Sequence, residues 1–354
     1  MSHDRGQARW QAIWRSRGPL AWALRPISLL YGGLSWTRRW LYGAGLLKVE
    51  RMPVPVVVVG NVLVGGAGKT PATLALLQHL KSQGWQPGVV SRGYGRKSTA
   101  TQEVHLDTPS EASGDEPALI RRQAGVPVFV AAKRAEAALA LLAAHPHVDI
   151  IVCDDGLQHL ALGRDLAIAV FDDRGTGNGW LLPAGLLREP WPPRSHSAFA
   201  PDLVLLQQSP TAMTTANLPT FDGERRLGNE AINGMGERNT LNDLARLNPT
   251  ALAGIARPEA FFTMLCQRGV PLIHTVSLPD HADASAYAEV LLAHPGAIVC
   301  TEKDAVKLFD AASELAQPDI LRIWAVPLEL RIEPAFFRAV DERLAKARNP
   351  SLRR

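Results

Sequence analysis

The chain has few cysteines for its length. Its 354 residues include three, Cys153, Cys266 and Cys300, which lie far apart and form no CxxC pair. This spacing argues against a disulfide scaffold and a zinc site, and it suits a protein of a reducing compartment. The chain also lacks a polar bias, with a hydrophobic fraction of 46% and a charged fraction of 20%. These fractions exclude an intrinsically disordered chain. A length of 354 residues allows one large or two ordinary folded domains.

The N-terminal segment, residues 1–52, lacks an apolar run long enough to cross a membrane. Arg25-Pro26 interrupts the run, and Arg38-Arg39 ends it before the roughly 20 residues that a spanning helix needs. The segment also lacks the compact apolar core and small-residue cleavage site of a signal peptide. We therefore expect neither a spanning helix nor a secretory leader here.

Basic and aromatic residues are concentrated in this same segment. Five of the nine tryptophans lie in it, at Trp10, Trp14, Trp22, Trp36 and Trp40. Its basic residues, nine in all, are opposed only by Asp4 and Glu50. This composition is typical of a segment on an anionic membrane surface, although an amphipathic helix packed on the protein with solvated arginines has the same periodicity. Nucleic acid is a weaker interpretation, because the rest of the chain is not basic.

Strand and helix patterns alternate from residue 54 to residue 206. Val54–Val59 is a near-continuous valine run, typical of a strand buried on both faces of a parallel sheet. Further strands are predicted at 88–91, 126–131, 149–153, 166–171 and 203–206, and helices at 70–82, 116–124 and 134–144. This alternation predicts an α/β fold with a doubly wound, mostly parallel sheet covered by helices on both faces.

A glycine-rich loop follows the first predicted strand. Residues 65–70 read Gly-Gly-Ala-Gly-Lys-Thr between a strand and a helix, which is the context of a P-loop. Glycine lets the backbone curl so that successive N–H groups point at phosphate oxygens, and the helix N-terminus adds a favourable dipole. The predicted nucleotide-binding residues are Leu63, Val64, Gly65, Gly66, Ala67, Gly68, Lys69 and Thr70. The P-loop consensus has glycine at the position of Leu63, which is a departure from the motif.

Lys69 and Thr70 have distinct expected roles at this loop. The lysine neutralises the β- and γ-phosphates, and the threonine hydroxyl is a ligand for magnesium. Asp154 and Asp155 end the predicted strand 149–153, where the carboxyl ends of parallel strands form the ligand crevice. This Walker B arrangement predicts a magnesium site to which either aspartate could contribute directly. Acidic residues at a strand end are also ordinary turn formers.

The pattern weakens between Gln207 and Asn248 and then resumes as a second, smaller α/β region. The predicted division is a membrane-surface segment at 1–52, a P-loop nucleotide-binding domain at 53–206, a linker or ribbon at 207–248, a smaller α/β domain at 249–333 and a C-terminal helix at 334–354. The expected fold is therefore P-loop NTPase-like, with a second α/β domain attached.

Three further residues carry no local pattern that indicates chemistry. Asp115 opens a predicted helix and fits a helix N-cap by type and position. His281 lies at the end of a strand in the second α/β region, and His159 is best interpreted as structural when taken alone. Local pattern assigns none of the three to a reaction.

An ordered set of motifs, from about residue 15 to residue 335, resembles the tetraacyldisaccharide 4′-kinase family. The set comprises Gly-Asn at 60–61, Gly-Lys-Thr-Pro at 68–71, Ser-Arg-Gly-Tyr-Gly at 91–95, Gly-Asp-Glu-Pro at 114–117, Asp-Asp-Gly-Leu-Gln-His at 154–159, Leu-Pro-Ala-Gly at 182–185, Arg-Glu at 188–189, Asp-His at 280–281 and Thr-Glu-Lys-Asp-Ala at 301–305. Ser-Arg-Gly-Tyr-Gly and Thr-Glu-Lys-Asp-Ala are not general P-loop features, so the resemblance is specific. Leu63 and Ala282 depart from the family's usual residues, and neither touches an expected chemical group.

The resemblance implies an activity late in lipid A biosynthesis. The family transfers the γ-phosphoryl group of ATP to the 4′-hydroxyl of a tetraacylated glucosamine disaccharide 1-phosphate. It implies ATP and Mg²⁺ as cofactors, Asp115 as the general base and His281 as its partner from a second domain that closes over the nucleotide. The implied location is peripheral, on the cytoplasmic face of the inner membrane. The expected partners are the glycolipid substrate and that membrane surface, with no nucleic acid and no obligate protein partner.

Arg92 and Arg188 are candidates for binding the substrate 1-phosphate or the ATP phosphates. A planar guanidinium suits phosphate because it donates two hydrogen bonds at once. The sequence does not single out either arginine.

Three other classes of protein compete with this interpretation. A membrane-positioned regulatory ATPase would pair a P-loop with an amphipathic anchor but would give no reason for Asp115 or His281. A GTPase needs Asn/Thr-Lys-x-Asp, whereas residues 301–304 read Thr-Glu-Lys-Asp, with lysine one position late. A small-molecule kinase of the cytosol leaves the tryptophan- and arginine-rich segment unexplained.

Overall fold

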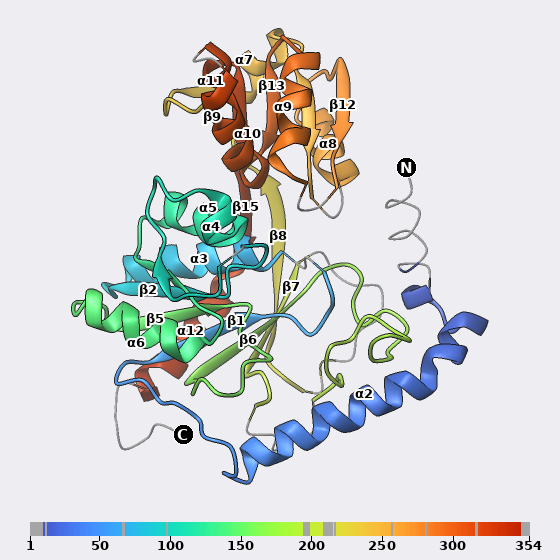
Figure 1. Ribbon diagram of the computed structural model, residues 1–354, viewed down its shortest axis with the longest axis vertical. Helices are drawn as coiled ribbons and strands as arrows, with labels where there is room; N and C mark the ends of the chain where they lie inside the picture. The colour runs from blue at the N-terminus through green and yellow to red at the C-terminus, as the bar shows by residue number, and fades with distance from the viewer. Residues whose placement is uncertain are drawn as a thin grey trace.

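The structure is a computed structural model, and its secondary structure forms two sheets joined by a ribbon (Figure 1). It describes residues 10, 13–65, 68–96, 98–193, 199–207, 215, 217–255, 258–279, 282–315 and 318–347.

The larger sheet has nine strands in the order β15-β8-β7-β6-β1-β5-β2-β4-β3. Their bounds are β1 Val56–Gly60, β2 Pro87–Ser91, β3 Gln102–Glu103, β4 Val128–Val130, β5 Ile150–Asp154, β6 Leu166–Phe171, β7 Leu203–Gln207, β8 Thr220–Leu227 and β15 Leu328–Ile332. In the part of the chain that the structure describes, neighbouring strands from β8 to β4 are parallel, and only β15 and β3, at the two edges, pair antiparallel. The predicted mostly parallel sheet is therefore confirmed.

Strand β1 shows why its sequence is a valine run. Val57 and Val59 pack in a core with three helices on one face of the sheet, α3 Lys69–Ser82, α5 Asp115–Ala124 and α12 Pro334–Ala347. Val56 and Val58 pack in a second core on the other face, which holds α6 Arg134–Ala144. Because both faces are covered, neither set of alternate side chains meets water and the strand has no polar face. The doubly wound arrangement is confirmed.

The smaller sheet has six strands in the order β10-β9-β14-β13-β11-β12. Its strands are β9 Glu230–Ile232, β10 Arg238–Thr240, β11 Thr250–Ala253, β12 His274–Ser277, β13 Ile298–Thr301 and β14 Ile323–Val326. Its helices are α7 Leu241–Arg246, α8 Pro258–Gln267, α9 Ala284–Ala293, α10 Glu302–Leu315 and α11 Pro318–Leu321. The short helix α4 Ser110–Ser113 belongs to the larger unit. One core includes residues of α9 and α10, and the other includes residues of α7 and α8.

Strands β8 and β15 form an antiparallel ribbon between the two sheets (Figure 1). The ribbon pairs Leu227 with Leu328 at one end and Gly223 with Ile332 at the other. The segment predicted as a linker or ribbon thus contains β8, β9, β10 and α7, and α12 returns to the large sheet. How the chain divides into independently folding domains stays a prediction.

Helix α2, Pro19–Gly43, lies along the side of the large unit (Figure 1). Pro26 lies inside it, so Arg25-Pro26 interrupts the apolar sequence without breaking the helix. The Ser28 hydroxyl donates a 2.9 Å hydrogen bond to the Leu181 carbonyl, and Trp22 meets Trp180 edge to face. This packing against the loop that carries Trp180 and Leu181 (the 180s loop) stabilises the helix despite the proline. Among the helices that the structure describes, none combines the length and apolar character needed to cross a bilayer.

The other face of α2 exposes large apolar side chains. They are Leu20, Ile27, Leu29, Leu30, Leu34, Trp36 and Trp40. One side of the helix therefore packs on the protein, while another presents an apolar surface.

Candidate functional site

The loop between β1 and α3 carries the P-loop residues. Gly68 has φ +70° and is the N-cap of α3, and a side chain there would collide with the Arg225 guanidinium and the Gln207 carboxamide. The Asn61 side chain donates a 3.2 Å hydrogen bond to the Gly65 carbonyl. Glycine is thus required at position 68 by both backbone conformation and space. Gly66 and Ala67 lie outside the described residues.

Leu63 and Val64 enter the loop from the core side. The Leu63 side chain is fully buried in the core, which accounts for a bulky residue where the consensus has glycine. The Val64 N–H donates a 2.9 Å hydrogen bond to the Leu186 carbonyl, and its own carbonyl accepts one of 3.1 Å from Arg174. Both residues therefore anchor the loop through the protein's own groups.

Three side chains that the sequence did not single out brace this loop. Gln207, at the end of β7, donates a 2.6 Å hydrogen bond to the Gly68 carbonyl. Arg225, on the ribbon strand β8, donates one of 2.6 Å to the Gln207 carboxamide oxygen. Arg174 pairs with Asp172 after β6. These residues come from strands far along the chain, so no local motif could have revealed them.

Lys69 and the strand-end aspartates lie close together. The Lys69 ammonium lies 3.5 Å from an Asp155 carboxylate oxygen, and its side chain is only 6% exposed. Thr70, the next residue, is also buried. Asp154 is 0% exposed and accepts a 3.0 Å hydrogen bond from the Thr73 hydroxyl on α3. The P-loop helix and the end of β5 therefore form one site.

The two aspartates differ in proton affinity. Burial, reinforced by Glu116 and partly offset by Lys69, raises the pKa of Asp154 to about 7. Burial alone would also raise the pKa of Asp155, but the charges of Lys69, Arg188 and Arg134 outweigh it and lower that pKa. Asp155 is thus the more readily ionised member of the pair, and Asp154 binds its proton more tightly.

The donor set fits a magnesium ion. The second carboxylate oxygen of Asp154 is buried and has no hydrogen-bond partner among the described residues. A buried, unsatisfied carboxylate oxygen beside a threonine hydroxyl is a hard oxygen site of the kind Mg²⁺ prefers. Within the described ranges, no group of three or more His, Cys, Asp or Glu side chains could hold a metal by itself. The remaining ligands would have to be phosphate oxygens and water, which is usual for Mg²⁺.

Basic side chains surround the outer side of Asp155. Arg188 lies 3.5 Å from both oxygens of Asp155. Arg134, which the sequence did not single out, is only 3% exposed and donates a 3.2 Å hydrogen bond to the Asp155 carbonyl. Its other two guanidinium nitrogens have no partner in the part of the chain described. Arg92 is exposed and raises the local positive potential at Arg134.

His159 lies among these arginines. Burial, followed by the charges of Arg134, Arg38 and Arg92, lowers its pKa to about 4. The imidazole is therefore neutral at physiological pH. Guanidinium groups gathered in this way are suited to an anion such as phosphate.

Asp115 lies at the start of α5. The N-cap is Gly114, with φ +88°, so Asp115 is the first helical residue and the predicted N-cap role is wrong. A side chain on Gly114 would collide with the backbone of Gly93 and Tyr94, so only glycine fits at this contact. Asp115 is buried, and Glu116 next to it acts electrostatically on Asp154. The base candidate therefore lies at the start of a helix whose second residue is close enough to act on Asp154.

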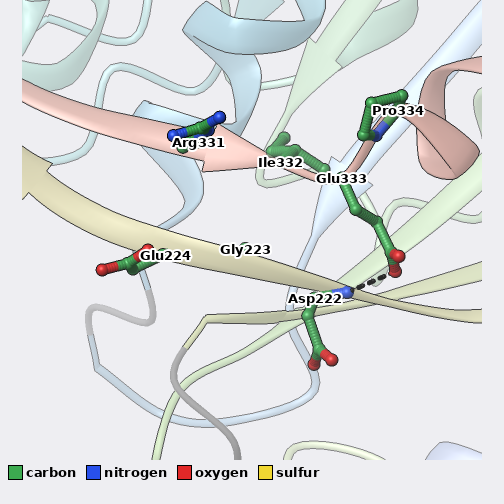
Figure 2. Close-up of a pocket in the computed structure, with 7 residues that line it drawn as sticks. All are labelled: Asp222, Gly223, Glu224, Arg331, Ile332, Glu333 and Pro334. Atoms are coloured by element: carbon green, nitrogen blue, oxygen red, sulfur yellow. Dashed lines mark hydrogen bonds between the residues drawn. The ribbon is translucent and has the colours of Figure 1, made fainter.

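His281 lies outside the described residues, so its pairing with Asp115 stays a prediction. A separate hollow of about 470 Å³ lies on the ribbon. It is lined by Asp222, Gly223, Glu224, Arg331, Ile332, Glu333 and Pro334, which Figure 2 shows. None of the candidate residues lines it, so the proposed chemistry is not located there.

A family model described as tetraacyldisaccharide-1-P 4′-kinase, or LpxK, matches residues 20–345. The chain belongs to this family. Among its relatives, a tetraacyldisaccharide 4′-kinase of Acidovorax sp. (strain JS42) is 53% identical over 340 residues, covering 95% of this chain and 94% of that one. The tetraacyldisaccharide 4′-kinase of Polaromonas naphthalenivorans (strain CJ2) is 52% identical over 333 residues, covering 93% and 92%.

The fold of this family has a solved example. A crystal structure of LpxK from Aquifex aeolicus, described as an "apo" form in complex with ATP, superposes with a TM-score of 0.76 at 29% identity. The match covers 92% of this chain and 99% of that one. The P-loop NTPase-like fold with a second α/β unit is therefore that of an LpxK.

Proposed function

We propose that this protein transfers the γ-phosphoryl group of ATP to the 4′-hydroxyl of tetraacyldisaccharide 1-phosphate, a step of lipid A biosynthesis. The observation that carries the proposal is the meeting of Lys69 with the strand-end Asp155 at 3.5 Å, in a chain of the tetraacyldisaccharide-1-P 4′-kinase family. It joins a nucleotide-binding lysine to the carboxylates at one edge of the sheet.

Lys69 and the loop would hold the phosphates for in-line attack. The lysine ammonium is almost fully buried beside Asp155, so its charge acts in a medium of low dielectric. Phosphoryl transfer passes through a loose transition state, so alignment and charge neutralisation supply most of the catalysis. Thr70, Asp154 and Asp155 would hold Mg²⁺, which when bound neutralises charge on the phosphate oxygens.

Asp115 would accept the proton of the attacking sugar hydroxyl. It is a buried carboxylate at the N-terminus of α5, on the same side of the sheet as Asp154. A positioned base contributes about 10²–10⁴-fold to a rate. His281 would be its partner from the second unit. Arg92 and Arg188, together with Arg134, would bind phosphate oxygens of the nucleotide or the glycolipid.

The exposed face of α2 would hold the enzyme on the cytoplasmic face of the inner membrane. The Tyr31 hydroxyl of this helix donates a 2.7 Å hydrogen bond to the Arg188 carbonyl, so the helix adjoins the candidate site. A lipid whose acyl chains stay in the bilayer would then present its sugar to that site. Leu30→Glu with Leu34→Glu should weaken binding to anionic vesicles at least about tenfold. Leu139→Glu, the same change at an exposed leucine of α6, should not; equal binding by all three proteins would contradict the membrane role.

The kinase is tested by incubating the purified protein with γ-labelled ATP, MgCl₂ and tetraacyldisaccharide 1-phosphate in detergent micelles. We expect label in the lipid, with Asp115→Asn and Lys69→Ala each lowering the rate by about 10²-fold or more. Consumption of ATP without labelled lipid would contradict the kinase and favour a regulatory ATPase.

A further inference from the structure

Lys307, on helix α10 of the smaller unit, reaches the candidate base of the larger unit. Its ammonium lies 3.1 Å from a carboxylate oxygen of Asp115, and the two side chains are only 13% and 8% exposed. The same ammonium donates a 2.8 Å hydrogen bond to the Ala282 carbonyl. It also lies 5.8 Å from the centre of the Tyr287 ring.

These three contacts fix a side chain that is normally flexible. Holding a lysine in one conformation costs up to about 2 kcal/mol of side-chain entropy. A buried carboxylate beside a buried ammonium is strongly favoured in its ionised form, and each charge would be costly without the other. Tyr287 is itself held by a 2.7 Å hydrogen bond from its hydroxyl to Asp304, so the platform under Lys307 is rigid.

The position of Lys307 along the chain makes the contact specific. Ala282 directly follows His281, so one ammonium holds Asp115 and the backbone next to the second predicted catalytic residue. A second tie between the same helices joins the Glu302 carboxylate of α10 to the Gln123 side chain of α5. This second tie links α5 to α10 without touching Asp115, and it offers a matched control.

We propose that Lys307 is a positioning residue of the phosphoryl-transfer reaction, which orients Asp115 toward the acceptor hydroxyl only when the two units are together. The inference rests on the proposed function, because it assigns Lys307 to act through the base of that reaction. Charged and titratable groups near this pair include Glu116 on α5, Asp283 before α9 and Tyr287 on α9. Lys307 is a cation that contacts the Asp115 carboxylate directly.

The test measures kcat, and KM for ATP and for the lipid, in wild type, Lys307→Met, Lys307→Arg and Gln123→Ala. A misplacement of about 1 Å can cost on the order of 10²-fold in rate, so we expect Lys307→Met to lower kcat by about 10–100-fold. Both KM values should stay within about twofold, because among the described residues Lys307 contacts Asp115, Ala282 and Tyr287, and not the P-loop or the arginines. Lys307→Arg should recover part of kcat, and Gln123→Ala should keep kcat within about twofold.

A double-mutant cycle separates positioning from general support of the fold. If Lys307 acts through Asp115, adding Lys307→Met to Asp115→Asn should slow lipid phosphorylation no further. Lys307→Gln, which keeps a donor but removes the charge, serves in the same cycle if the methionine variant does not fold. A further loss in the Asp115→Asn background, or an unchanged kcat in Lys307→Met, would overturn the inference. Wild type that labels no lipid would overturn the proposed function itself, and the inference with it.

Discussion

Asp304 in the smaller unit and Asp154 in the larger unit are both 0% exposed, but they differ in how many hydrogen bonds their carboxylates accept. Asp304, in the first turn of α10 after β13, accepts hydrogen bonds from the Gly254 N–H at 2.9 Å and the Tyr287 hydroxyl at 2.7 Å. Its other oxygen accepts one of 2.5 Å from the Thr301 hydroxyl. Asp154, at the end of β5, accepts one from Thr73 and keeps its second oxygen without a partner among the described residues.

Burial raises the pKa of both carboxyls, so a shifted pKa does not by itself distinguish a structural aspartate from one at a site. The difference lies in what satisfies each oxygen. Asp304 is saturated by its own protein, which makes it a fixed point of the smaller unit. Asp154 is incomplete, and a buried oxygen left incomplete indicates a ligand. The predictions below test whether this difference separates architecture from chemistry.

The largest effect on stability is expected at the saturated aspartate. Asp304→Ala leaves the Gly254 N–H and the Tyr287 and Thr301 hydroxyls without their acceptor, and each buried unsatisfied group costs about 1–3 kcal/mol. We expect the free energy of unfolding to fall by about 3–5 kcal/mol. Urea titration followed by circular dichroism measures it. A loss below about 1 kcal/mol would show that the network does not support the smaller unit.

At the incomplete aspartate the expected effect is on rate. Asp154→Asn keeps an acceptor for Thr73 but removes the charge offered to a cation, so kcat for lipid phosphorylation should fall about 10²–10³-fold. The free energy of unfolding should change by less than about 1 kcal/mol, because no saturated network is lost. The same preparation serves for label transfer and urea titration. An active but unstable variant would reverse the comparison.

Glu302 should make the stability of the fold depend on pH. Burial raises its pKa to about 7, while hydrogen bonds from the Leu328 N–H and the Gln123 side chain offset part of that rise. Because the folded state binds this proton more tightly than an unfolded glutamate near pKa 4.3, its stabilising contribution is complete at low pH and is lost as pH rises through about 7. The free energy of unfolding should therefore be greater at pH 5 than at pH 8, by at most about 3 kcal/mol.

The control for this dependence is Glu302→Gln, which cannot titrate. Its unfolding free energy should vary less between pH 5 and pH 8 than that of wild type. An unchanged pH profile in the variant would assign the dependence to other groups.

The smallest expected effects come from removing one hydroxyl on each side. Thr73→Val removes a hydrogen bond to Asp154, and Thr301→Val removes one of several to Asp304. Each should lower the free energy of unfolding by about 1 kcal/mol. Only Thr73→Val should also lower kcat, because it alone alters the carboxylate at the site. Equal kcat values for the two variants would erase the distinction.

Local pattern was sufficient for the parts of the fold whose determinants are close in sequence. The valine run of β1 predicted a doubly buried strand. The strand-end aspartates were expected near the P-loop because parallel strands present their carboxyl ends at one edge, and Asp155 lies 3.5 Å from Lys69. The alternation of strands and helices predicted the doubly wound sheet. These features needed no knowledge of distant partners.

Features that depend on contacts distant in sequence were not predictable. Gln207 and Arg225 brace the P-loop from β7 and β8, and Lys307 reaches Asp115 from the other unit. No motif contains Gln207 or Arg225, and the motif at 301–305 ends before Lys307. The N-cap assignment of Asp115 failed because Gly114 adopts a conformation closed to other residues, where it packs on the loop at Gly93 and Tyr94. Pro26 stays helical because α2 packs on the 180s loop, a tertiary contact that outweighs local propensity.

The central claim is that the 4′-hydroxyl of the glycolipid is the phosphoryl acceptor. The most direct measurement offers the wild-type enzyme two acceptors with γ-labelled ATP, tetraacyldisaccharide 1-phosphate and the same lipid lacking its 4′-hydroxyl. We predict label in the first lipid and none in the second, with mass spectrometry showing one added phosphate on the distal sugar. Equal labelling of both lipids, or label found only in inorganic phosphate, would contradict the claim.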